Sequence, residues 1–241
     1  MTSRRRSLGA LAALAAAMLV AASDAPPPTD FVAEREEMVA RQIEARGVRD
    51  PRVLAAMRRV PRHRFVPEEL REFAYEDRPL PIGSGQTISQ PYMVAVMTEL
   101  LGPGLGDNVL EIGTGCGYQA AVLAELGARV SSIEIVPELA KSARKRLADV
   151  GYAQVVVVEG DGWLGLPGKA PFDRILVTAA PEHVPEALVD QLRIGGRMVL
   201  PVGGEEQWLR VLEKTEDGIR EQQLFPVRFV PMVEGRHAPA K

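Results

Sequence analysis

The stretch that decides the fold is Val109-Leu110-Glu111-Ile112-Gly113-Thr114-Gly115-Cys116-Gly117-Tyr118. Its first four residues are typical of a buried strand, and the alternating glycines that follow predict a tight turn. A helix is expected next, from Gln119 to Leu126. Glycine is needed where a ligand approaches the backbone closely or where φ is positive. The stretch therefore predicts a strand, a ligand-binding turn and a helix, in that order.

Short apolar runs separated by helical stretches continue towards the C-terminus, which is the pattern of a parallel sheet with crossover helices. Two later runs flank Asp217-Gly218 and predict an antiparallel hairpin at the end of the sheet. We therefore expect an α/β protein with a Rossmann-like three-layer α/β/α fold, a mostly parallel sheet with antiparallel C-terminal strands, and a helical N-terminal segment. The expected strands are 108–112, 129–135, 154–159, 173–178, 197–202, 208–214 and 219–225.

The N-terminus has the composition of an export signal. Arg4-Arg5-Arg6 precedes an uncharged run, rich in alanine and leucine, that extends from Ser7 to Ser23. The apolar part is shorter than the roughly 20 residues that span a bilayer. Ser3-Arg4-Arg5 also matches the start of a twin-arginine signal. We expect residues 1–23 to be a signal-like segment; a disordered extension or a misassigned start codon are the alternatives.

The rest of the chain is expected to form one domain. Residues 24–30 include three consecutive prolines and predict a linker. Residues 31–241 contain no further linker and no internal repeat. Within this single domain we expect a helical N-terminal part at 31–101 and the sheet at 107–235.

Composition excludes several classes of protein. The chain has 241 residues, 46% of them apolar, which is enough for one substantial core. A single cysteine, Cys116, and three scattered histidines predict neither a disulfide nor a metal site. The net charge of −3 and the lack of a basic stripe with interleaved aromatic residues argue against a nucleic-acid partner.

Acidic residues close the next two predicted strands. Glu134 follows the glycine-rich turn by about 20 residues, where a carboxylate can accept both hydroxyls of a ribose. Asp161 closes the following strand between two glycines and could face an adenine amine. The turn has the spacing G-x-G-x-G, which differs from the G-x-G-x-x-G of dinucleotide folds. Together, at the carboxyl ends of three parallel strands, these residues predict one nucleoside site.

Further motifs resemble those of the protein-L-isoaspartate (D-aspartate) O-methyltransferase family. The short glycine turn with Glu111 ahead of it is similar to the S-adenosylmethionine loop of class I methyltransferases, and Gly85-Gln86-Thr87-Ile88-Ser89-Gln90-Pro91 is similar to a segment specific to this family. The resemblance covers roughly residues 33–235. Supporting matches are Val60–Pro67, Gly160–Gly162, Pro171–Asp173, Val177–Ala180, Gly195–Arg197, Pro201–Gly203 and Val227–Pro231.

The resemblance implies an enzyme that methylates the α-carboxyl of L-isoaspartyl residues, and the carboxyl of D-aspartyl residues, in damaged proteins. The methyl ester then collapses through a succinimide and so initiates repair. The implied donor is S-adenosyl-L-methionine, with no metal. The expected partners are proteins and peptides that contain isoaspartyl or D-aspartyl residues. We expect a monomer with no nucleic-acid partner and no stable membrane span in the mature chain.

The resemblance also implies a cytoplasmic location, which conflicts with the signal-like residues 3–23. Export to the periplasm is therefore kept as an alternative. An exported enzyme would start near Asp24.

The same resemblance assigns roles to residues of the candidate site. Ser89 is the implied active-site hydroxyl; a helix cap before Pro91 is the alternative reading of this serine. Gln86 and Thr87 are expected to shape the substrate loop. The residues implied to bind the donor are Glu111, Gly113, Gly115 and Gly117 around its methionine part, Glu134 at its ribose, and Asp161 and Gly162 at its adenine.

The chemistry needs few polar groups. A carboxylate with a pKa of about 4 is already ionised at neutral pH, so it can attack a sulfonium methyl group without a general base. A modest effect is therefore predicted for Ser89→Ala. Three alternatives stay open at this point: a class I methyltransferase with another acceptor, a non-catalytic exported binding module, and a nicotinamide oxidoreductase.

Overall fold

The glycine-rich stretch folds as predicted, into β3 (Asn108–Ile112), a turn and α4 (Tyr118–Glu125). The computed structural model describes residues 30–235, and the fold presented below is that of the body that begins at Phe31. The signal-like residues 1–23 lie outside the described residues. Within the described part of the chain, no helix has the length and apolarity needed to cross a membrane.

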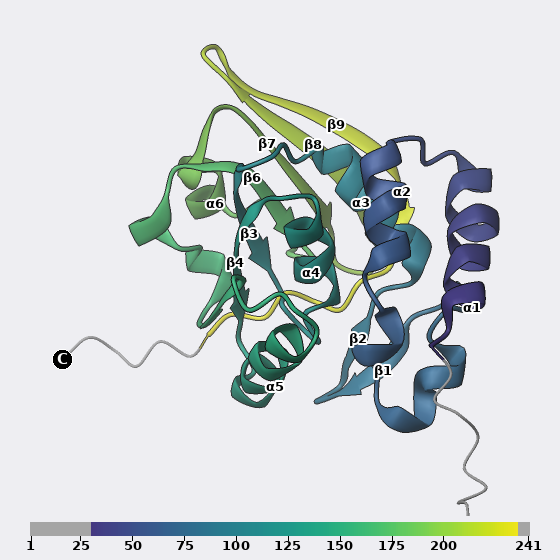
Figure 1. The fold of residues 1–241 in the computed structure, drawn as a ribbon. Coiled ribbons are helices and arrows are strands. Elements are labelled where there is room, and N and C mark those ends of the chain that lie inside the picture. The colour runs from purple at the N-terminus through teal and green to yellow at the C-terminus, as the bar shows by residue number, and fades with distance from the viewer. Residues whose placement is uncertain (1–29, 236–241) are drawn as a thin grey trace, which may run out of the picture. The chain divides into compact units, whose positions relative to one another are not determined.

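A seven-stranded sheet forms the centre of this body (Figure 1). Five neighbouring strands of this sheet run parallel to one another, while the last two strands of the chain are antiparallel to their neighbours. This is the predicted mostly parallel sheet with antiparallel C-terminal strands. In spatial order the strands are β5 (Val156–Glu159), β4 (Arg129–Glu134), β3, β6 (Phe172–Val177), β7 (Leu192–Val202), β8 (Gln207–Thr215) and β9 (Gly218–Val227).

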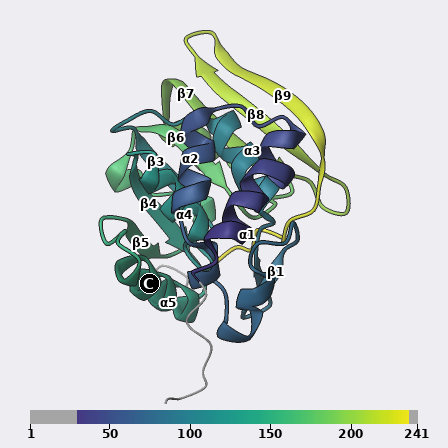
Figure 2. The same cartoon turned by 45° about the vertical axis from the view of Figure 1, so that its right-hand side comes forward.

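Alternate residues of the strands face two separate hydrophobic clusters, which is why the sheet is covered on both sides. Val109 packs in the larger cluster with the helices before β6, whereas Leu110 and Ile112 pack in the smaller one with Leu188 of α6 (Glu186–Gln191). Figure 2 shows α1 (Val32–Glu37), α2 (Pro51–Arg59) and α3 (Pro91–Leu101) next to one another. The helices of the larger cluster are α2, α3, α4 and α5 (Pro137–Asp149), together with the segment Met38–Ile43 that continues α1.

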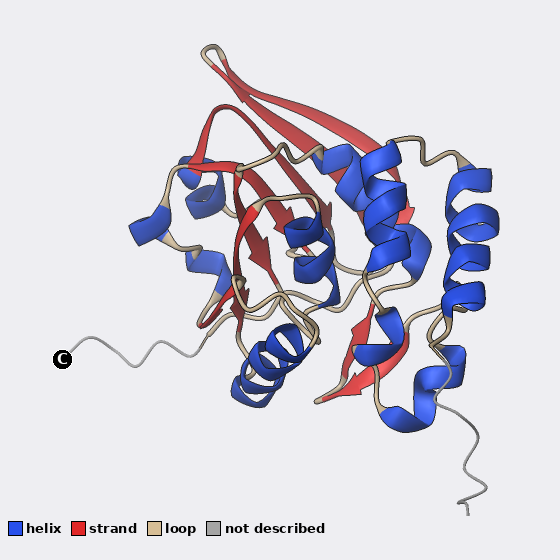
Figure 3. Ribbon diagram, viewed as in Figure 1, coloured by secondary structure: helices blue, strands red, loops and turns tan. Residues whose placement is uncertain are grey.

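A small hairpin, which the sequence pattern did not predict, interrupts the helical N-terminal part. β1 (Leu80–Gly83) pairs antiparallel with β2 (Gln86–Ile88), apart from the main sheet (Figure 3). Its turn has positive φ at Gly83 (97°), Ser84 (51°) and Gly85 (70°). The hairpin carries Gln86 and Thr87 to the carboxyl edge of the sheet, where both line a cavity with residues of β4.

The predicted strand boundaries differ from the observed ones mainly in β7. This strand begins at Leu192, whereas the prediction began at Arg197. Gly195 and Gly196 lie within it, and the pairing with β6 shifts register between Phe172 and Arg174. Glycines weaken a strand pattern in sequence and often accompany such irregularities.

Candidate active site

The glycine-rich turn lies where the strand order of the sheet reverses. β3 is flanked by β4 on one side and by β6 on the other, and both run parallel to it. Ligands bind at the carboxyl ends of the strands at such a position. The Gly113 N–H donates a hydrogen bond to the Ile133 carbonyl at 2.9 Å, which holds the start of the turn against β4.

Gly113 cannot be replaced without strain. Its φ is +95°, and a Cβ atom would lie 2.5 Å from Oγ1 of Thr178. That hydroxyl is fixed, because it donates towards the carbonyls of Ile112 (3.0 Å) and Gly113 (2.8 Å). The glycine therefore keeps the end of β3 close to the end of β6.

Glu134 ends β4 and faces the turn. Its Oε2 accepts a hydrogen bond from the Gly115 N–H at 2.7 Å, and its Oε1 accepts one from the Val136 N–H at 2.9 Å. The residue is only 5% exposed, yet no basic side chain of residues 30–235 forms an ion pair with it. Each carboxylate oxygen keeps a lone pair beyond its bond to the backbone, so both can accept further hydrogen bonds from a ligand.

These residues surround a cavity, here called the glycine-loop cavity. One wall is the turn and the end of β4, and the opposite wall comes from the end of β6 and the C-terminal segment. The lining residues are Gln86, Thr87, Ile112, Gly113, Gly115, Ile133, Glu134, Ile135, Val136, Gly162, Thr178, Ala179, Val230, Pro231, Met232 and Val233. A mostly apolar wall with one carboxylate and exposed backbone groups is suited to a nucleoside.

Glu111 lies behind the turn and is fully buried. Burial raises the pKa of this carboxyl to about 8, against the effect of the hydrogen bond from Ser132, and the charge of Glu134 raises it further. Ser132 Oγ contacts Thr114 Oγ1 at 2.6 Å, so the hydroxyl links the acid to the turn. Glu111 Oε1 has no hydrogen-bond partner among the described residues.

A second cavity, here called the Ser89 cavity, adjoins the first. The two share Thr87, Thr178, Val230 and Pro231. Ser89 is half-buried, and none of the hydrogen bonds between described residues uses its hydroxyl. The remaining wall comes from Arg46, Pro79, the start of α3, the end of β9 and the segment that follows β9. The Ser89 cavity is therefore bounded by elements far apart in the sequence.

Comparison with known proteins decides the family. The family model described as protein-L-isoaspartate(D-aspartate) O-methyltransferase matches residues 33–237. The chain belongs to this family. The protein-L-isoaspartate O-methyltransferase of Gloeobacter violaceus is 58% identical over 197 residues, which cover 81% of this chain and 96% of that protein. The protein-L-isoaspartate O-methyltransferase 2 of Syntrophobacter fumaroxidans is 52% identical over 96% of this chain and 99% of its own length.

Solved structures agree with the fold. A structure of a protein-L-isoaspartate O-methyltransferase superposes with a TM-score of 0.75 at 30% identity and covers 82% of this chain and 65% of that chain. A structure of a putative protein-L-isoaspartate O-methyltransferase from Plasmodium falciparum, in complex with S-adenosyl-L-homocysteine, superposes with a TM-score of 0.74 at 24% identity. The match covers 83% of this chain and 99% of that chain. The predicted Rossmann-like methyltransferase fold and family are confirmed.

Family membership makes the chain an S-adenosylmethionine-dependent carboxyl methyltransferase that acts on isoaspartyl residues and initiates their repair. The prediction of function from the sequence is confirmed in this respect. The three alternatives, namely another acceptor, a non-catalytic module and an oxidoreductase, lose their support.

Three residues that the sequence assigned to the methyltransferase's donor lie outside the lining of the glycine-loop cavity. Glu111 is behind the turn, as described above. Gly117 starts α4 and packs against Leu147, whose Cγ would lie 3.1 Å from an added Cβ atom. Asp161 accepts hydrogen bonds from the N–H groups of Trp163 (2.9 Å) and Gly235 (2.8 Å). Of the predicted Asp161-Gly162 pair, Gly162 alone lines the cavity.

Ser89 does not cap α3. The residue before the helix is Gln90, and no side chain forms a capping hydrogen bond there. The helix begins at Pro91, which lacks the N–H that a cap would satisfy first. The alternative reading of Ser89 as a helix cap is therefore wrong, and Ser89 lines the Ser89 cavity.

Sequence reasoning missed the part of the site that comes from the C-terminal segment. Ala180 donates to the Val230 carbonyl at 2.8 Å, and the Met232 N–H donates to the Ala180 carbonyl at 2.8 Å. This short parallel bridge carries Val230–Val233 across the end of β6 into the glycine-loop cavity, and Val230 and Pro231 also line the Ser89 cavity. The one available signal was the match of Val227–Pro231 to the family; nothing marked Met232.

Within residues 30–235, no group of three or more His, Cys, Asp or Glu side chains is arranged to hold a metal ion.

Proposed function

We propose that the glycine-loop cavity holds S-adenosyl-L-methionine and that the Ser89 cavity holds the isoaspartyl or D-aspartyl residue that is methylated. One observation carries this proposal: the two cavities share Thr87, Thr178, Val230 and Pro231, so groups bound in them can meet. The family activity needs such an arrangement, because a carboxylate oxygen must approach the methyl group in line with its bond to sulfur.

The lining of the glycine-loop cavity is suited to the donor. Glu134 offers two carboxylate oxygens to the ribose hydroxyls, while its bonds to the backbone fix its orientation. Gly162 lines the cavity on the side proposed for adenine. It packs closely on Ile112 and Met232, because an added Cβ atom would lie 2.3 Å from Ile112 Cγ2 and 3.1 Å from Met232 Cε. Gly113 and Gly115 present backbone to the methionine part. When bound, the donor supplies a methyl group on a positively charged sulfur.

Catalysis by this chain is proposed to consist mainly of positioning. The acceptor carboxylate is ionised at neutral pH, so no side chain has to remove a proton. Ser89 donates a hydrogen bond to one carboxylate oxygen and leaves the other free to attack. A strong bond would also stabilise the ground-state anion, which limits how much one hydroxyl can contribute. Thr87, on β2, holds the substrate at the shared wall, whereas Gln86 beside it lines the glycine-loop cavity but not the Ser89 cavity.

The remaining predicted residues are proposed to act from behind the cavity. Glu111 supports the turn through Ser132 and Thr114. Gly117 allows the close packing of α4 on α5. Asp161 fixes the loop that carries Gly162 and ties it to the C-terminal segment through the Gly235 N–H.

The test is transfer of labelled methyl from S-adenosylmethionine to an isoaspartyl peptide, with the normal aspartyl peptide as the control. Base-labile label on the isoaspartyl peptide alone is expected. The matched variants are Thr87→Val, in the shared wall, and Thr215→Val, in the distant β8–β9 turn. Transfer that is reduced equally by both variants, or that ignores the isoaspartyl linkage, would contradict the placement of the two substrates.

The remaining expectations are proposals about the whole chain. We propose a cytoplasmic monomer in which residues 1–23 and 24–30 precede a single domain at 31–241, and export to the periplasm remains the alternative. The signal-like composition of residues 3–23 supports export, whereas the cytoplasmic location implied by the family resemblance supports the cytoplasm. Sequencing the N-terminus of protein recovered from cells separates them, since a start near Asp24 indicates export.

A further inference from the structure

A separate cavity, here called the arginine cavity, lies between α5 and the two 3₁₀ turns Arg62–Arg64 and Glu68–Phe73. Three guanidinium groups line it: Arg64, Arg71 and Arg146. It shares no lining residue with the glycine-loop cavity or the Ser89 cavity. The proposed methyl transfer uses none of its residues.

The N–H donors of these three arginines outnumber the acceptors that the protein offers them. Arg71 Nε and Arg146 Nη1 are buried, and neither has a hydrogen-bond partner among the described residues. Within residues 30–235, Arg64 and Arg146 form no ion pair with a carboxylate. Buried donors of charged groups are normally satisfied in folded proteins, so these N–H groups point to an acceptor outside the protein chain.

The two acids in the lining do not balance this charge. Glu68 accepts one long bond from Arg71 Nη1, at 3.4 Å. Asp149 is engaged by Lys145 one turn earlier on α5. Three arginines against two engaged carboxylates leave a site that attracts an anion.

From this geometry we propose that the arginine cavity binds a compact oxyanion, either free phosphate or the phosphate group of a larger molecule. Guanidinium groups donate pairs of parallel N–H bonds that match the oxygens of phosphate. Three of them, from two 3₁₀ turns and one helix, surround a single anion better than they pair with side chains of the same chain. A bound anion would join α5 to the N-terminal part of the domain.

The cavity lies close to the donor loop. Burial raises the pKa of the Cys116 thiol in that loop, and the charges of Arg62 and Arg146 both oppose the shift. Leu147, the neighbour of Arg146, packs against Gly117. An anion held by Arg146 would therefore restrain the helix on which the glycine turn rests.

The experiment is isothermal titration of the full chain with inorganic phosphate at constant ionic strength, with and without saturating S-adenosylhomocysteine. We expect saturable binding in both conditions, since the proposed site shares no lining residue with the donor cavity. Arg64→Gln and Arg146→Gln should each weaken binding about tenfold, because each loses a charged hydrogen-bonding group. Arg220→Gln, which removes the same charge from exposed β9, should leave binding unchanged.

Because Arg64 is exposed, Arg64→Gln should fold normally, and it tests phosphate binding even where Arg146→Gln fails to fold. O-phosphoserine, titrated in the same way, separates the two sources of the anion: binding indicates access for phosphate esters, and failure limits the site to the free ion. Absence of phosphate binding, or equal weakening by Arg220→Gln, would overturn the proposal. The measurement needs no methyl transfer, so its outcome is independent of the proposed function.

Discussion

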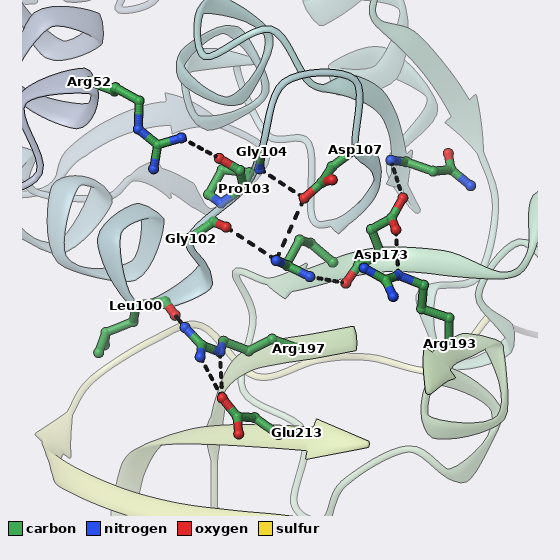
Figure 4. A network of polar contacts seen from close by, with 12 residues as sticks. Arg52, Leu100, Gly102, Pro103, Gly104, Asp107, Asp173, Arg193, Arg197 and Glu213 are labelled. Atoms are coloured by element: carbon green, nitrogen blue, oxygen red, sulfur yellow. Dashed lines mark hydrogen bonds and ion pairs between the residues drawn. The ribbon is translucent and has the colours of Figure 1, made fainter. Parts of the chain in front are cut away.

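At the amino edge of the sheet, where β3 and β6 begin, acidic side chains are paired with arginines (Figure 4). Asp107 faces Arg174 at 3.7 Å, and Asp173 is paired with Arg193. At the carboxyl edge, Glu134 is bonded to backbone N–H groups, with no ion pair among the described residues. In the first arrangement the carboxylates are neutralised by guanidinium groups of the protein, whereas in the second the carboxylate keeps acceptors for a ligand.

The amino-edge network also joins separate elements. Arg197 of β7 donates to the Leu100 carbonyl at 3.0 Å and is paired with Glu213 of β8. Gly104 N–H donates to Asp107 at 2.8 Å. Figure 4 shows the contacts of Arg197 with Leu100 and Glu213 as a group separate from those around Asp107 and Asp173. The comparison supports the proposal that the carboxyl edge binds the substrates, while the paired charges of the amino edge stabilise the fold.

The largest expected effect is that of Gly113→Ala at the carboxyl edge. The added Cβ would lie 2.5 Å from Thr178 Oγ1, in a backbone with a φ of +95°. We expect donor affinity to fall on the order of 100-fold, as for a displaced binding group. The control is Gly106→Ala before β3, with a φ of +78° and no atom of the described residues within 4 Å. An equal loss of affinity in both variants would mean that backbone strain alone is responsible.

Glu111→Gln should change the pH dependence of stability. The pKa of Glu111 is raised to about 8 by burial, so the folded state holds its proton where the unfolded state has lost it. The protonated Glu111 carboxyl therefore makes its full contribution to stability below pH 4.5, and this contribution is lost as the pH rises to about 8. The free energy of unfolding of the glutamine variant, measured relative to wild type, should therefore be higher at pH 8.5 than at pH 5 by on the order of 2 kcal/mol. Urea unfolding at both pH values measures it; a constant difference would contradict the raised pKa.

Asp173→Asn should show the opposite trend at the amino edge. Burial would raise the pKa of Asp173, but the Asn108 N–H and the Arg193 guanidinium outweigh it and lower the pKa. Its stabilisation is thus present above the unfolded pKa of 3.8 and is lost as pH falls through the lower folded value. We expect a loss on the order of 1 kcal/mol at neutral pH, reduced because Arg193 is partly exposed. Thermal unfolding at pH 7 and pH 3 tests this, and a loss that is larger at pH 3 would be inconsistent with it.

Ser89→Ala should have the smallest effect on stability. Because Ser89 does not cap α3, the free energy of unfolding should stay within about 0.5 kcal/mol of wild type. Its hydroxyl contributes one hydrogen bond to an already ionised acceptor, so kcat/KM should fall about tenfold. Steady-state methyl transfer to an isoaspartyl peptide measures the change. A drop of several thousandfold would assign Ser89 a role beyond positioning.

Much of the sheet was predictable from the sequence because parallel strands are buried on both faces and read as apolar runs. The bounds of β3 were predicted without error, and those of β6 to within one residue. The β1–β2 hairpin was missed because Pro79 and Pro81 obscure a very short strand pattern. Such hairpins depend on tertiary packing more than on local propensity.

The candidate site was predictable where a strand end carries a distinctive residue, as for Gly113, Gly115 and Glu134. Asp161 could not be placed, because an acid after a strand can face either the cavity or its own loop. The contribution of Met232 was invisible, since it depends on a bridge between Ala180 and Pro231 that joins segments about 50 residues apart.

The most direct test of the comparison is the affinity for S-adenosylhomocysteine of Glu134→Gln, set against that of Asp173→Asn. Glu134→Gln should weaken binding between about 10-fold and 100-fold, because a charged acceptor of hydrogen bonds is lost. Asp173→Asn should bind like wild type while unfolding at a lower temperature. Unchanged affinity in Glu134→Gln, or an equal loss in Asp173→Asn, would contradict the assignment of donor binding to the carboxyl edge of the sheet.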